Sequence, residues 1–207
     1  MARLQDAQAS ASVCAAAVAA ELDRASHVAR QLSLTAKNAR VVVMRAGNRA
    51  ASLKVISDFF DDLASKTIAL AKNINVVAID ISRMAVSGWR GSMLVSQLHR
   101  SAELAAEWGV NVSLDASTQI IEAKHEELVD GFHKKLMKLA TELSEIQRLM
   151  RAANVISVTS RLEATQTGEF EGILVEMANT IQSQSDQIKL HVSRSQQLLE
   201  STLNQSE

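Results

Sequence analysis

The chain of 207 residues contains no proline and no tyrosine, and only seven glycines, four phenylalanines and two tryptophans. Without proline, no residue in the chain is obliged to break a helix, and the abundant Ala, Leu, Gln and Glu are good helix formers. Aromatic side chains supply much of the apolar area in ordinary cores. A chain with so few of them is better suited to narrow aliphatic seams between helices than to a thick core.

Two further shortages exclude whole classes of protein. The one cysteine, Cys14, cannot form an intrachain disulfide and is typical of a reducing compartment. The formal net charge is −1 with both signs interspersed, so the chain lacks the long basic stripe of a nucleic-acid binder. Lys134, Lys135 and Lys138 form a small basic cluster of the kind found on a solvated helix face. The apolar stretch over residues 9–20 is alanine-rich and far too short to span a bilayer. We expect a cytoplasmic protein without a membrane span.

What the chain does have is a regular apolar pattern. Apolar residues recur at alternating steps of three and four, which is typical of helices packed as coiled coils. The pattern is strong in the second and third quarters of the chain and weaker in the first and fourth. Its clearest members are Leu53, Ile56, Phe60, Leu63, Thr67, Leu70, Ile74, Val77, Ile81 and Met84, then Val129, Phe132, Leu136, Leu139, Leu143, Ile146, Met150 and Ala153.

Three breaks interrupt this pattern. Gly47 followed by Asn48 is a helix stop, Gly168 is another, and residues 108–118 are rich in turn and N-cap residues. Helices as long as those between the breaks cannot fold back into a globule. The sequence therefore predicts an all-α fold, an elongated antiparallel four-helix coiled-coil bundle of two hairpins with both tips at one end. The predicted helices span residues 1–46, 48–108, 113–167 and 169–205. They make one bundle domain from a first hairpin (1–107), a connector (108–114) and a second hairpin (115–207).

The two hairpins look like copies of one unit. A shift of 121 residues superposes Gly47 on Gly168 without a gap and also brings Arg40 onto Arg161. Heptad patterns align with themselves at any multiple of seven, but 121 is not such a multiple. We interpret the match as an internal repeat.

The residues around the two glycines resemble a known family. The first copy reads VARQLSLTAKNARVVVMRAGNRAASLKVISDFFDDLA over residues 28–64, and the second reads ANVISVTSRLEATQTGEFEGILVEMANTI over residues 153–181. Both are similar to the cytoplasmic signalling hairpin of methyl-accepting chemotaxis receptors, although each copy is degenerate. Those receptors dimerise, so that two hairpins form a four-helix bundle with both tips at one end. The resemblance implies a fused version, in which one chain supplies both hairpins.

In that family the tip contacts the chemotaxis histidine kinase, its coupling protein and neighbouring receptors. Each copy here keeps a different half of the family's polar tip residues. Copy one keeps the arginine as Arg45, where copy two has Gln166, and copy two keeps the glutamate as Glu163. For Arg45 and Glu163, a solvated charge near a helix end remains an equal alternative to a partner contact. The resemblance assigns the partner contact to Asn38, Arg45, Val55, Thr159, Glu163, Gln166 and Glu169.

The resemblance therefore implies a chemoreceptor-like cytosolic signalling or adaptor protein that acts through helix contacts. The alternative is a structural or oligomerising helical scaffold unrelated to chemotaxis. Catalytic signals are thin, and we expect no enzymatic activity and no cofactor. Glu122 and His125 have the spacing of a metal pair on a helix, but the bundle-symmetric counterpart is missing. We read them as a surface pair, and a metal-binding bundle enzyme remains only a third interpretation.

Three glycines are expected at similar levels of the bundle. Gly88 and Gly91 fall in the seam of the second helix, and Gly131 should lie within about two turns of the same level. Glycine in a helix interior costs about 1 kcal/mol against alanine. Chemotaxis receptors have a glycine hinge in this type of position, so one interpretation is a hinge. The other is that glycine admits a bulky neighbour such as Trp89.

The second helix also carries a second apolar stripe. Ile79, Val86 and Met93 recur every seven residues, with Trp89 beside them, on the side predicted to face away from the seam. A helix that is apolar on two faces is expected to be covered on both, so the stripe predicts self-association or a docked partner. The alternative is a wrong register around the glycines.

Overall fold

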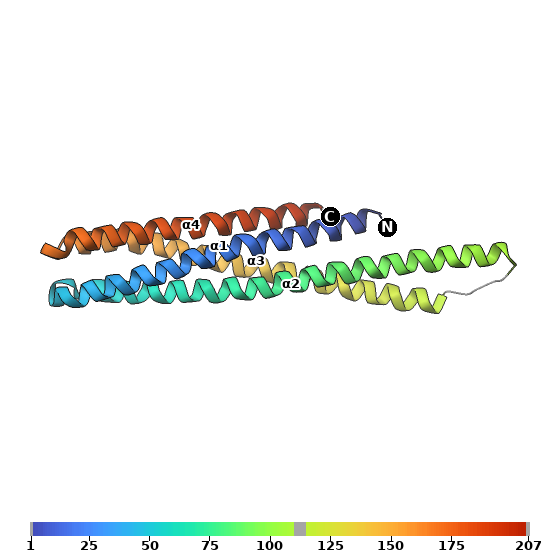
Figure 1. Cartoon of the computed structure of the whole chain (residues 1–207), viewed down its shortest axis with the longest axis horizontal. Helices are drawn as coiled ribbons and strands as arrows, with labels where there is room; N and C mark the ends of the chain where they lie inside the picture. Colours follow the sequence, from blue (N-terminus) through green and yellow to red (C-terminus); the bar gives the residue numbers. More distant parts are fainter. Residues whose placement is uncertain (1, 110–114, 206–207) are drawn as a thin grey trace.

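The computed structural model describes residues 2–109 and 115–205, which form four long α-helices (Figure 1). The helices are α1 (Ala2–Ala46), α2 (Ala51–Glu107), α3 (Asp115–Ala164) and α4 (Glu171–Gln205), and two 3-10 turns, η1 (Gly47–Ala50) and η2 (Gly168–Phe170), lie within the hairpins. Residues 110–114 of the predicted connector lie outside the described ranges.

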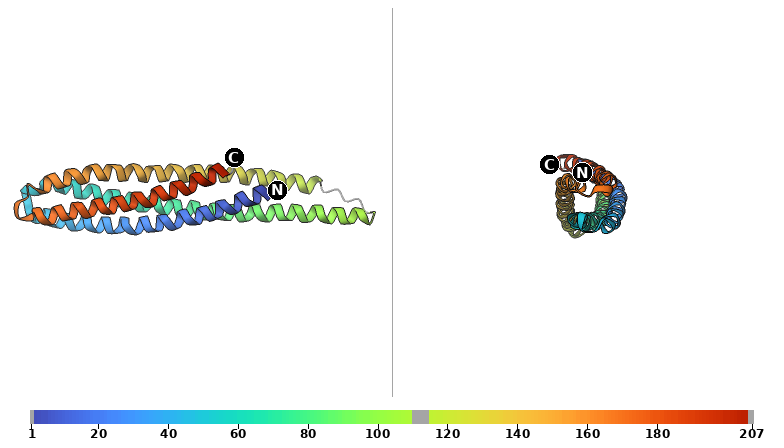
Figure 2. Two further views of the ribbon diagram at one scale, coloured as in Figure 1. Left: turned by 90° about the horizontal axis from the view of Figure 1, so that it is seen from above. Right: turned by 90° about the vertical axis from the view of Figure 1, so that its left-hand side faces the viewer.

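The four helices lie side by side as a rod. α1 packs against α2 and α4, and α3 packs against the same two helices, so the end-on view shows a square (Figure 2). Both hairpin turns lie at one end of the rod, and α2 and α3 run past α1 and α4 at the other (Figure 1). The predicted elongated antiparallel four-helix bundle is confirmed.

The core consists of the residues that the three–four spacing predicts. Leu22 of α1, Ile74 of α2, Leu139 of α3 and Ile188 of α4 are all buried, with exposed fractions of 0–1%. Full burial of such a side chain contributes about 1.5–3 kcal/mol relative to leaving it exposed. Phe60 is the largest fully buried side chain. The apolar pattern is weaker in α1 and α4 than in α2 and α3, but it identifies residues of the same core.

The glycines of the two hairpin turns have the same backbone conformation. Gly47 has a φ of 66° and Gly168 a φ of 65°, in the left-handed region, and a 3-10 turn begins at each glycine. A residue with a Cβ atom pays roughly 1–2 kcal/mol in that region. The two glycines that the repeat superposes therefore have the same role, which is to provide the left-handed residue of a hairpin turn.

The helix boundaries at the turns differ from the predicted ones. α3 ends at Ala164 rather than residue 167, because the Thr167 hydroxyl and amide both donate to the Ala164 carbonyl, at 2.6 and 3.1 Å. This bond closes a tighter turn than an α-helical one. α2 and α4 begin at Ala51 and Glu171, three and two residues later than predicted, because the 3-10 turns precede them.

Serines and threonines occupy several core positions. Thr67, Ser157, Ser185 and Ser195 are fully buried, and each hydroxyl donates to the carbonyl four residues earlier on its own helix. A buried hydroxyl without a partner would cost about 1–3 kcal/mol. The local bond removes that cost, so the bundle accommodates these residues without a polar network across the core.

Polar contacts also join the two hairpins. His191 of α4 donates to Glu21 of α1 at 2.7 Å, and Gln184 of α4 donates to Thr35 of α1 at 3.4 Å. Each of these contacts crosses from the first hairpin to the second. They help to fix the register of α1 against α4.

In the described part of the chain, no helix combines the length and apolarity needed to cross a membrane.

The Glu21–His191 pair makes the stability of the bundle depend on pH. The hydrogen bond from His191 lowers the pKa of Glu21 below 4.5, burial opposes this shift, and Arg24 adds to it. The ionised Glu21 therefore stabilises the folded state fully above pH 4.5, and this contribution is lost as the pH falls through the lower folded-state pKa.

We expect the free energy of unfolding of the parent to fall more steeply below pH 4.5 than that of Glu21→Gln, measured by urea denaturation. The exposed Glu200 provides the control, since Glu200→Gln should keep the parent's slope. Equal slopes for the parent and Glu21→Gln would contradict the prediction.

Candidate functional site

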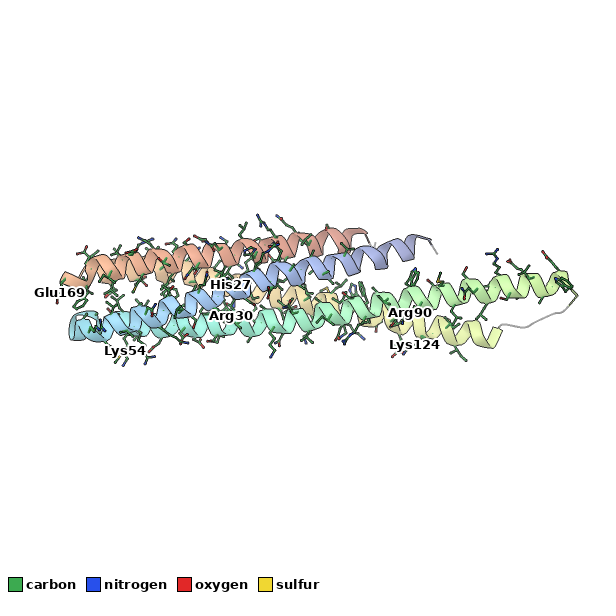
Figure 3. All side chains as sticks on the ribbon, viewed as in Figure 1. His27, Arg30, Lys54, Arg90, Lys124 and Glu169 are labelled. Carbon is green, nitrogen blue, oxygen red and sulfur yellow. The ribbon has the colours of Figure 1, made fainter. Side chains whose placement is uncertain are left out.

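The residues that the resemblance assigns to a partner contact gather at the end of the rod that holds both turns. Asn38, Arg45, Thr159 and Gln166 are exposed, and Val55 is 71% exposed although it is apolar. Glu169 lies at the same end as Lys54 (Figure 3). A valine with that exposure has no role in the core. The fold thus presents these residues to solvent from α1, α2, α3 and the turn between α3 and α4.

Glu163 is the exception in this set, because it is half-buried and already has a partner. The Ser52 hydroxyl of α2 donates to its carboxylate at 2.6 Å. This contact joins the tip of the first hairpin to that of the second. Glu163 is therefore held in place within the bundle, while Arg45 has no ion pair among the described residues.

The tips also expose apolar side chains at matching positions of the repeat. Leu34 and Val155 are 61% and 69% exposed, and Val41 and Leu162 are 50% and 63% exposed. Each pair is separated by 121 residues. Seven-residue spacing puts the two members of each hairpin on one face of their helix. The rod end therefore carries one short apolar stripe on α1 and an equivalent one on α3.

Charge at the tips is segregated, which the composition of the whole chain conceals. Residues 38–57 hold four basic residues and no acidic one, a net charge of +4. The equivalent residues 159–178 hold one basic and four acidic residues, a net charge of −3. Just beyond the first of these ranges, Asp58 pairs with Arg40 at 3.0 Å, so the excess positive charge near the first turn lies on Arg45, Arg49 and Lys54. The sequence alone contains this difference in charge, and it appears when the net charge is counted for each copy of the repeat and not for the whole chain. The charged residues are Arg40, Arg45, Arg49 and Lys54, and Arg161, Glu163, Glu169, Glu171 and Glu176.

At the predicted glycine layer, the residue beside Gly131 is Met84. A Cβ atom on Gly131 would lie 3.0 Å from Cε of Met84, whereas one on Gly91 would meet nothing within 4 Å. Gly88 is buried in the α2 seam and Trp89 is 47% exposed. Gly131 thus admits a methionine across the α2–α3 seam. The hinge at Gly88, Gly91 and Gly131 stays a prediction.

The second stripe on α2 is about half exposed along its length, with exposed fractions of 52% for Ile79, 45% for Val86, 47% for Trp89 and 46% for Met93. Ile79 and Val86 border a groove shared with α1, so they do not face directly away from the bundle. The interface predicted for this stripe is still untested.

The remaining candidates act as surface or core residues. Lys134 contacts Asp130 at 2.7 Å and Lys135 contacts Asp80 at 2.6 Å, so these lysines belong to surface ion pairs. The hydrogen bond from Lys135 lowers the pKa of Asp80. Cys14 is buried. The side chains of Glu122 and His125 lie outside the described ones, and no group of three metal-ligating side chains occurs among those described.

Comparison with models of known protein families gives no match, and neither does comparison with curated proteins.

Proposed function

We propose that this protein is a chemoreceptor-like signalling or adaptor protein of the cytoplasm, without enzymatic activity, which binds its partners at the hairpin tips. The partners proposed are a chemotaxis histidine kinase and its coupling protein. One observation carries the proposal. The residues that match the receptor family's contact positions meet at one end of the rod, and all but Glu163 are exposed there.

Two further features support a contact surface at the tips. The equivalent apolar stripes at Leu34 and Val41 and at Val155 and Leu162 are exposed beside these residues. Apolar groups flanked by charge are typical of protein interfaces. The tips also lie at a free end of the rod, where a partner meets no steric obstacle from the rest of the bundle (Figure 2).

The rival function is a structural or oligomerising scaffold with no link to chemotaxis. The half-exposed stripe on α2 favours this second reading, because it offers an interface that does not involve the tips. The two proposals differ in where a partner binds, and each makes a different residue set sensitive to substitution.

A pull-down with purified chemotaxis kinase and coupling protein separates the two. We expect the parent to retain them at micromolar concentration and the Arg45→Glu, Val55→Glu double variant to bind at least about tenfold more weakly, because both side chains are exposed interface anchors. Arg100→Glu is the matched control, since Arg100 is exposed on α2 near the end of the helix that lies away from the tips. Absence of binding by the parent would favour the scaffold.

A further inference from the structure

A groove runs between α1 and α2 in the shaft of the rod, well away from the tips. It has a volume of about 660 Å³ and is open to solvent. Its floor is formed by alanines, among them Ala15, Ala16 and Ala19 of α1. Ile79 and Val86 of α2 form its apolar wall.

The groove exists because the side chains of α1 are short at this level. Residues 7–20 of α1 are mostly alanine and serine and include no charged residue. An alanine cannot reach over the side chains of the neighbouring helix, so Ile79 and Val86 stay 52% and 45% exposed. A surface of small residues lets a further helix approach closely, and helix axes in such contacts lie about 8–10 Å apart. The shape of the groove therefore fits a helix.

The charge along the groove has one sign. Residues 81–102 of α2 include three arginines and no acidic residue. Arg83 and Arg90 line the groove and are seven residues apart, so they lie on one face of α2. Arg90 has no ion pair in the described part of the chain, and Figure 3 shows it on the flank of α2. Arg83 approaches Asp80 only to 4.0 Å, while Asp80 is held at 2.6 Å by Lys135.

We propose that this groove binds an acidic amphipathic helix of a partner protein. The apolar face of that helix packs on the alanine floor against Ile79 and Val86. Its carboxylates pair with Arg83 and Arg90 at the rim. This is the helix-in-groove mode of recognition, with apolar anchors at helical spacing and charge at the edge. The groove is independent of the function proposed for the tips. If the kinase fails to bind at the tips, the groove can still bind an acidic helix.

The probe for this site is a labelled synthetic peptide of about three heptads, long enough to form a helix on binding. It has leucine at the first and fourth positions of each heptad and glutamate or alanine elsewhere. A matched peptide has lysine in place of every glutamate. Binding to the full chain is followed by fluorescence anisotropy. We expect the acidic peptide to bind and the lysine peptide to bind at least about tenfold more weakly.

Two variants test the two halves of the groove separately. Arg83→Glu with Arg90→Glu reverses the rim and should raise the dissociation constant of the acidic peptide at least about tenfold. Ala16→Trp fills the floor from an exposed position and should block binding without disturbing the core. Arg100→Glu on the same helix is the control and should bind as the parent does. Circular dichroism confirms that each variant is as helical as the parent.

Three results would overturn the proposal. The first is equal binding of the two peptides, or none of the acidic peptide. The second is unchanged affinity in the rim variant or the floor variant. The third is a parent that sediments as a dimer and becomes monomeric with Val86→Glu and Met93→Glu, because the occupant would then be a second copy of this chain.

Discussion

Replacing Phe60 with alanine is expected to lower the free energy of unfolding by about 3–5 kcal/mol, the usual cost of removing a buried phenylalanine. Phe60 is fully buried, and the ring of Phe59 meets it edge-on with centroids 5.8 Å apart. The chain has only four phenylalanines, and both tryptophans are exposed. Few other side chains in this narrow core could move into the space left behind.

Urea denaturation followed by circular dichroism measures this loss. Val55→Ala on the same helix is the control, because Val55 is 71% exposed and its truncation should change stability by less than about 0.5 kcal/mol. A loss for Phe60→Ala no larger than that of the control would place Phe60 outside the cooperative core.

The second large effect is expected at the turns. Gly47→Val should destabilise the protein by about 1–2 kcal/mol, and adding Gly168→Val should roughly double the loss. A Cβ atom on Gly47 would meet nothing within 4 Å, so the cost comes from the left-handed backbone and not from a clash. Thermal and urea unfolding of the single and double variants measure it.

A substitution at a third glycine is the control, because it is expected to change the free energy of unfolding in the opposite direction. Gly172 lies in α4, where an added Cβ atom also meets nothing within 4 Å. Its helical backbone suits alanine, so Gly172→Ala should stabilise the protein by about 0.5–1 kcal/mol. If Gly47→Val were neutral, or if Gly172→Ala destabilised the protein, backbone conformation would not explain the use of glycine at the turns.

The seams could be predicted from the sequence because burial follows helical spacing alone. Leu139 of α3 and Ile74 of α2 belong to apolar patterns with steps of three and four residues, and both are buried. The helix ends could not be predicted in the same way. α3 stops at Ala164 because the Thr167 hydroxyl captures a carbonyl, which is a local choice that hydrophobic periodicity does not record.

The groove was hidden for a different reason. The exposure of Val86 depends on which residues of α1 lie opposite, and the spacing within α2 contains no information about them. The stripe was therefore predicted to face away from the bundle, whereas Ile79 and Val86 border the alanines of α1. The charge of the tips was present in the sequence throughout. It follows from counting residues 38–57 and 159–178 separately, because these equivalent ranges carry charges of opposite sign.

Because one chain contains both hairpins, a single substitution in its gene changes only one of the two tips. In a symmetric dimer of hairpins, one substitution in the gene changes both tips, because the same residue appears twice. In this chain a substitution at Arg45 leaves its counterpart Gln166 as it was, so selection can act on each tip separately. A symmetric dimer of identical hairpins could not have the net charges of +4 for residues 38–57 and −3 for residues 159–178 that this chain has.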